Sequence, residues 1–287
     1  MYSRPVKSGS DVRLNRLTTR APHDLGKDEA KKEFQRLATE LGELQELLFA
    51  ADTHALLVVF QGMDTSGKDG GIRDVFSDVN AAGCRVASFK VPSATELAHD
   101  FLWRVHQQTP ERGHIAVFNR SHYEDVLIVR VHDLVPKSVW SRRYDEINAF
   151  ERQLTANGTI VLKFFLHISR EEQKERLLAR EANPAKSWKL SVDDWKERER
   201  WNAYQRAYAD AISRCSTEDA PWFVIPADQK WFRNLAVTER IVKTLRPFAP
   251  AWRKKLTEIG KQETAALVQA RADGIIEPIA EADKNDS

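Results

Sequence analysis

The chain has 287 residues, of which 42% are hydrophobic and 30% are charged, and its formal net charge is +2. This composition supports a sizeable core under a polar surface, while the small net charge argues against a nucleic-acid binder, so any anion site must be a local cluster. No apolar run reaches the ~18 to 20 residues of a membrane span, the N-terminus lacks the apolar core of a signal peptide, and the chain has only two cysteines, which together favour a cytoplasmic protein without membrane contact.

The first 54 residues predict an arm followed by a helix. Residues 1–23 are polar and aperiodic, which is typical of a mobile arm. From Phe34 to Leu48, apolar residues recur at spacings of three and four, which predicts an amphipathic helix. Because its apolar stripe needs a partner, we expect this helix to pack on the domain that follows.

The segment "HALLVVFQGMDTSGKDGGIRDVF" predicts a buried strand, a glycine-rich loop and a helix. The continuous apolar run from Leu56 to Phe60 is typical of a parallel strand covered on both faces. Gly62, Gly67 and Lys68 match the phosphate-binding pattern G-x-x-x-x-G-K-[ST], but Asp69 stands where the pattern has a magnesium-binding hydroxyl.

A phosphate site after this strand has a clear physical basis. Glycines let successive backbone N–H groups turn toward one anion, the helix N-terminus adds partial positive charge, and Lys68 supplies a full charge to the transferring phosphate. The alternative is a structural strand-to-helix turn with a solvated lysine. The residues predicted to contact phosphate or nucleotide are Asn119 and Arg176 together with the loop residues Gly62, Met63, Thr65, Ser66, Gly67, Asp69 and Gly70.

The rest of the chain alternates strands and helices. Further strands are predicted at 85–91, 114–121, 159–169 and 221–228, and helices at 95–108, 138–156, 170–182, 192–213 and 231–246. This alternation predicts an α/β fold with a five-stranded parallel sheet between two helical layers. We expect residues 55–250 to form this core, and residues 251–287 to form a C-terminal helical extension and tail.

Polar residues end the third strand. Asn119 and Arg120 follow its apolar run, and Asp125 comes shortly after. In open α/β folds, ligands bind at this carboxyl edge of the sheet. Magnesium commonly takes one or two carboxylates together with phosphate oxygens and water, so Asp64 and Asp125 are the candidate metal ligands. The alternative for Arg120 and Asp125 is a surface ion pair.

A basic segment follows the fourth strand. Between 176 and 189 it contains four basic residues, Arg176, Arg180, Lys186 and Lys189, and one acid, Glu181. Nucleotide kinases carry a lid that closes on phosphates at this place in the fold. We therefore expect a lid at about 176–206, with a solvated helix pair as the alternative. Lys230 and Arg233, after the last strand, are weak candidates for contact with a nucleotide base.

Five motifs in this order resemble the polyphosphate kinase family 2 pattern across roughly residues 30 to 248. They are "GMDTSGKDGGI", "FKVPSATELAHDFLWR", "FNRSHYEDVLIVRV", "RLLAREANPAKSWKLS" and "DDWKERERWNAYQRAY". The family is similar in fold to thymidylate kinase, a P-loop kinase with a helical lid. It transfers phosphoryl groups between inorganic polyphosphate and purine nucleotides. Family members carry Asp or Gly at the position of Asp69, so the resemblance accounts for the departure from the usual loop pattern.

The resemblance also implies roles for single residues. It assigns Asp64 and Asp125 to magnesium (manganese could substitute) and phosphoryl transfer, Lys68 and Arg120 to phosphate, and Arg176 and Arg180 to the lid. Because polyphosphate is a uniform polyanion, its path should be a basic groove, for which Lys90, Lys186 and Lys189 are candidates. The "GKDG" form resembles class III members, which phosphorylate AMP and ADP, whereas "GKGG" is commoner in the ADP-specific class I.

Two other functions stay open at this stage. An ATP-dependent nucleoside monophosphate kinase of the thymidylate type would share the loop and lid but need no long basic groove. A silent nucleotide or polyanion sensor would keep the site without turnover. The amphipathic N-terminal helix and the tryptophan-rich C-terminal third leave room for a homo-oligomer, a dimer or a tetramer.

Overall fold

A five-stranded parallel sheet forms the centre of the computed structural model, which describes residues 2–184 and 192–277. The strand order is β2-β3-β1-β4-β5, and every neighbouring pair is parallel. The strands are β1 (Ala55–Gly62), β2 (Cys84–Ser88), β3 (Ile115–Asn119), β4 (Thr159–His167) and β5 (Trp222–Pro226). The predicted α/β class, the parallel sheet and all five strands are therefore confirmed.

The longer helices alternate with the strands. They are α1 (Lys27–Ala51), α2 (Lys68–Val75), α7 (Arg143–Ala156), α8 (Arg170–Glu181), α9 (Val192–Glu199), α10 (Trp201–Cys215), α11 (Lys230–Leu245) and α12 (Ala249–Ala272). One-turn helices are α3 (Ala94–Leu97), α4 (Trp103–His106), α5 (Ile128–Val131) and α6 (Lys137–Trp140). Short 3-10 turns cover η1 (Leu14–Arg16), η2 (Ala81–Gly83), η3 (His122–Val126) and η5 (Arg246–Phe248).

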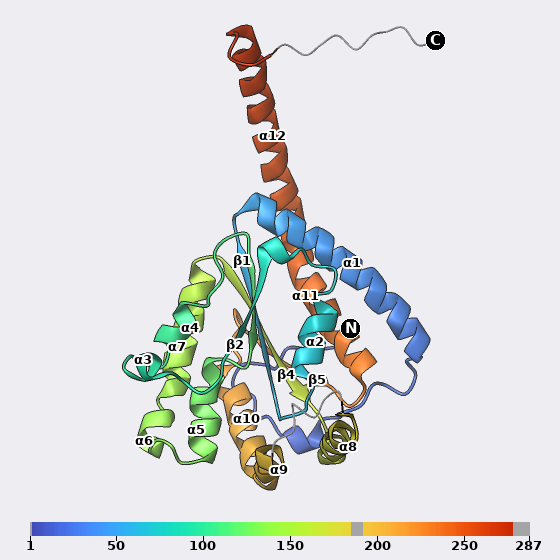
Figure 1. The fold of residues 1–287 in the computed structure, drawn as a ribbon, viewed down its shortest axis with the longest axis vertical. Coiled ribbons are helices and arrows are strands. Elements are labelled where there is room, and N and C mark those ends of the chain that lie inside the picture. Colours follow the sequence, from blue (N-terminus) through green and yellow to red (C-terminus); the bar gives the residue numbers. More distant parts are fainter. Residues whose placement is uncertain (1, 185–191, 278–287) are drawn as a thin grey trace.

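Helices cover both faces of the sheet, so the fold has three layers. Figure 1 shows α1, α2 and α11 on one side and α4, α5, α6 and α7 on the other. β1 is buried along its whole length, and its alternate residues enter two separate core clusters, as the two-residue period of a strand requires. Leu57 and Val59 join the cluster that contains Phe150 of α7, whereas Val58 and Phe60 join the larger one.

Three predicted helices are interrupted in the structure. The stretch 95–108 contains only α3 and α4, since the Asp100 carboxylate accepts a hydrogen bond from the backbone N–H of Leu102 between them. Such local side-chain bonds compete with helix continuation. Likewise 138–156 divides into α6 and α7, and 192–213 divides into α9 and α10 at Arg200.

The N-terminal arm lies on the sheet, although its polar sequence predicted a mobile segment. Pro5 pairs with Phe223 of β5 in an antiparallel bridge, and the Val6 N–H donates to the Trp222 carbonyl. Leu14 is buried, and its carbonyl lies 3.0 Å from His167 Nε2. The arm therefore covers the β5 edge, which would otherwise expose unpaired strand groups.

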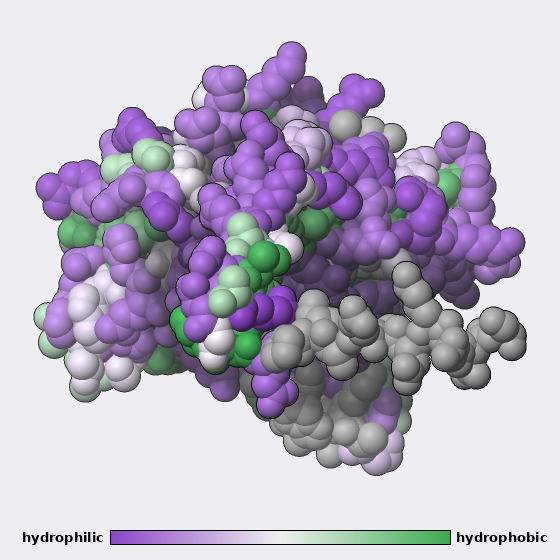
Figure 2. All heavy atoms as spheres, turned by 90° about the horizontal axis from the view of Figure 1, so that it is seen from above, coloured by the Kyte–Doolittle hydropathy of each residue, from purple (hydrophilic) through white to green (hydrophobic). Residues whose placement is uncertain are grey.

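The predicted C-terminal helix is present as α12, which extends away from the body in Figure 1. Trp252 anchors its first turn in the core. Figure 2 shows the molecule from the α12 end, where hydrophilic side chains dominate the visible surface. Within residues 2–184 and 192–277, no helix is long and apolar enough to cross a membrane.

Candidate active site

The glycine-rich loop connects β1 to α2 at the carboxyl edge of the sheet. Its backbone needs left-handed conformations at Thr65, where φ is +59°, and at Gly67, where φ is +96°. A side chain at Gly67 would also place Cβ 2.3 Å from Arg233 Nη1. Gly67 is therefore required by conformation and by space.

The side chain of Lys68, the first residue of α2, points back into the loop that precedes it. Its Nζ donates hydrogen bonds to the carbonyls of Gly62 at 2.9 Å and Met63 at 3.3 Å, and the side chain is buried. Burial, and next the nearby Arg120, lower the pKa of the Lys68 ammonium. A phosphate bound in the loop would relieve both effects, so this position suits an anion.

The acid segment, which we define as residues 119–125, begins at the last residue of β3 and lies beside the loop. Arg120 has a left-handed φ of +61°, and its N–H donates to the Phe60 carbonyl of β1. Its guanidinium lies 3.0 Å from the Asp64 carboxylate. Asn119 donates to Asp69 at 2.8 Å. The residue that breaks the usual loop pattern thus contacts the acid segment, which joins the two predicted motifs.

Glu124 is the acid of this segment that interacts with the loop, and no sequence pattern pointed to it. Burial raises the pKa of its carboxyl, while Arg120 and Lys68 oppose that rise and Asp64 adds to it. All three of these neighbours belong to the predicted phosphate site. The only signal in the sequence was adjacency, because Glu and Asp stand side by side in "HYED" and spacing does not tell which one points inward.

Asp125 has a different set of neighbours. It lies 3.2 Å from Arg143 Nη1 and 3.8 Å from Arg104 Nη2, and its side chain is 13% exposed. Burial raises the pKa of Asp125 to about 6, although both arginines oppose the rise. Its proposed metal role stays a prediction, which a comparison with Glu124 can test.

A buried network holds the acid segment from below. Lys163 of β4 forms an ion pair with Glu151 of α7, and both side chains are at most 1% exposed. The Glu151 carboxylate lies 3.1 Å from His122 Nε2 and accepts a hydrogen bond from Tyr123 at 2.9 Å. Burial would raise the pKa of Glu151, but Lys163 and His122 reverse the shift and lower it. The network therefore fixes η3, which carries Glu124.

The predicted lid approaches the same place. Arg180 of α8 lies 2.7 Å from Asp194 of α9. Burial and the nearby Asp64 raise the pKa of Asp194, against Arg180 and Arg120. Arg180 thus pairs with a carboxylate that interacts electrostatically with Asp64 and Arg120. Of the predicted groove residues, Lys90 is exposed after β2, and Lys186 and Lys189 lie outside the described residues.

The other predicted lid residue, Arg176, lies against the backbone of the loop. Its guanidinium donates to the carbonyls of Thr65 and Ser66, both at 2.9 Å. Arg233, the weak candidate for base contact, donates to the Gly67 carbonyl at 2.9 Å and is 2% exposed. Both arginines thus touch the loop on the side where its carbonyls point.

The carboxylates present fit a magnesium ion held largely by substrate. Among the described residues, no cluster of three or more His, Cys, Asp or Glu could hold a metal alone. Asp64 and Glu124 interact electrostatically beside Lys68. Magnesium is commonly bound by one or two carboxylates plus phosphate oxygens and water, which is the donor set that this pair and a bound polyanion would supply.

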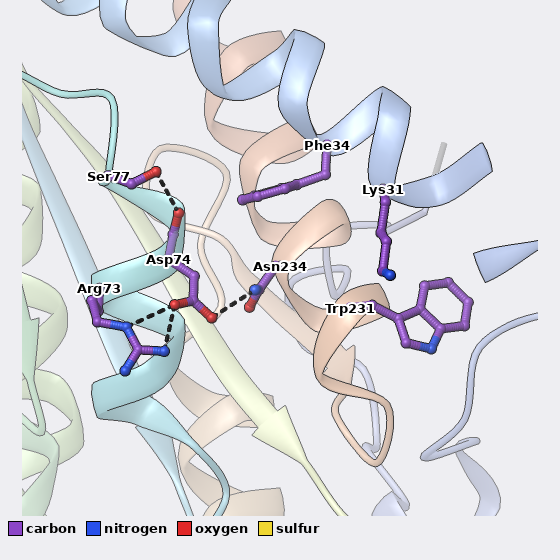
Figure 3. Close-up of a pocket in the computed structure, with 7 residues that line it drawn as sticks. All are labelled: Lys31, Phe34, Arg73, Asp74, Ser77, Trp231 and Asn234. Atoms are coloured by element: carbon purple, nitrogen blue, oxygen red, sulfur yellow. Dashed lines mark hydrogen bonds and ion pairs between the residues drawn. The ribbon is translucent and has the colours of Figure 1, made fainter. Parts of the chain in front are cut away.

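A separate cavity of about 580 Å³ lies between α1, α2 and α11. Figure 3 shows Phe34, Asp74 and Trp231 among the side chains around it. None of its lining residues is a predicted site residue, so we do not assign the phosphate site to it.

The strand order and the loop–helix junction that carries Lys68 define a P-loop kinase fold. The model of the family described as "Polyphosphate kinase 2 (PPK2)" matches residues 24–250. The chain therefore belongs to the polyphosphate kinase 2 family, as the five motifs predicted.

Individual relatives agree with this assignment. The chain is 54% identical to an AMP/ADP-polyphosphate phosphotransferase of Meiothermus ruber over 78% of this chain and 84% of that protein. It is 46% identical to an ADP-polyphosphate phosphotransferase of Rhodopseudomonas palustris over 90% and 96%. The crystal structure of polyphosphate kinase 2 from Arthrobacter aurescens TC1 is similar at a TM-score of 0.82 and 41% identity, covering 85% of this chain and 88% of that one.

Proposed function

We propose that this protein transfers phosphoryl groups from inorganic polyphosphate to AMP and ADP, in a reversible reaction that depends on magnesium. One observation carries the proposal: a P-loop with a buried lysine adjoins Arg120 and two carboxylates, in a chain of the polyphosphate kinase 2 family. Relatives named for polyphosphate-dependent phosphorylation of AMP and ADP support it.

The chemistry needs charge and position more than acid–base groups. An ionised oxygen of the acceptor's terminal phosphate attacks the end phosphorus of polyphosphate, and the bond from that phosphorus to the rest of the chain breaks. Polyphosphate leaves one unit shorter. The acceptor oxygen is already deprotonated at neutral pH, and the transition state of phosphoryl transfer is loose, so aligned cations supply most of the catalysis.

Each cation has a place in this scheme. Lys68 lies in the loop and would bind the transferring phosphate, and Arg120 would bind the acceptor side. Arg180, from the lid, would exchange Asp194 for phosphate oxygens as the lid closes. His122 takes no part as a nucleophile, because it is fully buried against Glu151.

Asp64 and Glu124 would hold magnesium together with the phosphates of the substrates, and Asp125 is the competing candidate. The ion would neutralise charge between donor and acceptor. Manganese, which accepts the same oxygen ligands, should substitute for it.

The acceptor is the finer part of the proposal. "GKDG" and the relative named for both AMP and ADP favour a class III enzyme, whereas the relative named for ADP alone favours a narrower one. An acceptor panel of AMP, ADP, GMP and GDP with polyphosphate, magnesium and no ATP decides between them. Turnover of AMP and ADP supports class III, and no turnover of any acceptor contradicts the proposed function. We also expect a homo-oligomer, which sedimentation would test.

A further inference from the structure

All six carbonyls of the loop from Gly62 to Gly67 accept hydrogen bonds from side chains. Lys68 Nζ donates to the carbonyls of Gly62 and Met63, and Gln173 donates to the Asp64 carbonyl at 3.1 Å. Arg176 donates to the carbonyls of Thr65 and Ser66, and Arg233 donates to the Gly67 carbonyl. The three donors other than Lys68 come from α8 and α11, which are far from the loop in sequence.

Arg176 has no donor left over for a ligand in this arrangement. A guanidinium carries five N–H donors. Besides the two loop carbonyls, Arg176 donates to the Ala227 carbonyl at 2.6 Å, the Asp228 carbonyl at 3.0 Å and Glu172 at 2.7 Å. Its five donors therefore have five protein acceptors, four of them backbone carbonyls.

Arg233 lies against the first turn of α2, where the glycines of "GKDGG" leave room for it. A Cβ at Gly67 would lie 2.3 Å from its Nη1, and one at Gly71 would lie 3.4 Å from its Nε. Asn234 accepts from Arg233 Nε at 2.9 Å and donates to Asp74 of α2 at 3.0 Å. Figure 3 shows this Asn234–Asp74 bond between α11 and α2. Arg233 is thereby fixed to the helix that the loop enters.

This arrangement orients the loop's peptide groups. In a planar trans peptide, the C=O of one residue and the N–H of the next point in opposite directions. Arginines that hold the carbonyls of Ser66 and Gly67 on one side therefore turn the N–H groups of Gly67 and Lys68 to the other side. Backbone N–H groups that converge in this way form an anion-binding concavity.

The two guanidiniums beneath the loop also have carboxylate neighbours: Arg176 pairs with Glu172 at 2.7 Å, and Arg233 Nη2 lies 3.7 Å from Asp74. Burial, and next the neighbouring Arg176, lower the pKa of Arg233 to about 10, so its guanidinium stays charged at neutral pH. Negative charge bound on the N–H side of the loop would offset the repulsion between the Arg176 and Arg233 guanidiniums.

We propose that Arg176 and Arg233 are positioning residues, which hold the carbonyls of Thr65, Ser66 and Gly67 so that the loop is preformed for the terminal phosphates of a polyphosphate donor. For Arg176 this replaces the direct phosphate contact that the sequence implied. The identity of the anion rests on the proposed function, whereas the positioning itself does not.

Binding of inorganic tripolyphosphate with magnesium, measured by calorimetry, tests the proposal without any acceptor. Arg176→Lys and Arg233→Lys keep the charge but lose the forked geometry. We expect each to weaken tripolyphosphate binding about tenfold or more, because a misplacement of about 1 Å is costly at such a site. Asn234→Ser, which leaves both guanidiniums and frees Arg233, should weaken binding less and keeps the test open if a lysine variant fails to fold.

Arg240→Lys is the matched control. Arg240 also lies on α11 and is buried, but it contacts Ser3 and Phe223 instead of the loop. It should lower the melting temperature like Arg233→Lys and leave tripolyphosphate affinity unchanged. Wild-type affinity in both Arg176→Lys and Arg233→Lys would overturn the proposal, as would equal weakening in Arg240→Lys. If the wild-type protein binds tripolyphosphate but transfers nothing, the proposed function fails and the positioning role stands.

Discussion

The phosphate loop and the acid segment follow neighbouring strands, yet they are built in different ways. The loop is held through its backbone, by side chains that bond its carbonyls. The acid segment is held through its side chains, by the buried Glu151–Lys163 pair beneath His122 and Tyr123. The comparison predicts that the loop tolerates changes of its own side chains better than the acid segment does, with Asp64, Gly67 and Lys68 as exceptions.

Lys68→Met should have the largest effect. It removes the cation that would bind the transferring phosphate, so we expect turnover to fall about 10²–10³-fold, as measured in a polyphosphate and ADP assay. Lys31→Met, on the exposed side of α1, is the control with unchanged turnover. An unaffected Lys68 variant would mean that the loop is only structural.

Glu124→Gln and Asp125→Asn form a pair that separates the two acids. Because Glu124 interacts with Asp64, Lys68 and Arg120, its loss should reduce turnover about 10²-fold. Asp125→Asn should cost less than about tenfold, since its partners are Arg104 and Arg143. The opposite ranking, or loss of magnesium dependence only in Asp125→Asn, would support Asp125 as the metal ligand in place of Glu124.

Glu151→Gln should act mainly on stability. It leaves Lys163 charged and buried, which typically costs about 3–5 kcal/mol, and a denaturant titration measures this loss. The double variant Glu151→Gln/Lys163→Met should recover much of it, because no buried charge remains unpaired. A double variant as unstable as the single one would show that the ion pair does not hold the segment.

His167→Gln gives the smallest expected effect, beneath the loop at the end of β4. Burial lowers the pKa of His167, so the unfolded chain binds a proton there that the folded protein does not. Stability is therefore complete above the ordinary value of about 6.5 and falls as pH drops below it. Between pH 7.5 and 5.5 the variant should lose about 2 °C less in Tm than the wild type. His99→Gln, at an exposed site, is the control and should lose as much in Tm over this pH range as the wild type.

Sequence patterns predicted the parts of the site that depend on local order. The buried run of β1, the glycines and Lys68 lie within a few residues of each other, so spacing alone placed them correctly at a strand–helix junction. The five strands were found for the same reason, since each is a short apolar run between turns.

The parts that depend on distant contacts were not predicted. No local signal tells that Arg233 reaches Gly67 across 166 residues, or that Arg176 bonds the loop. The arm at 1–23 was expected to be mobile because its contacts with β5 and α11 use backbone groups and single side chains instead of a periodic stripe. Glu124 was not predicted as a site residue, because the direction of its side chain within η3 depends on the buried network below it.

The most direct test of the account is phosphorus NMR of the wild-type protein with AMP, polyphosphate and magnesium, without ATP. We expect the β-phosphate resonance of ADP to grow as the polyphosphate end-group signal changes, and we expect this growth to be about 10²–10³-fold slower in Lys68→Met. A protein that leaves AMP unchanged with polyphosphate, but phosphorylates a nucleoside monophosphate once ATP is added, would contradict it.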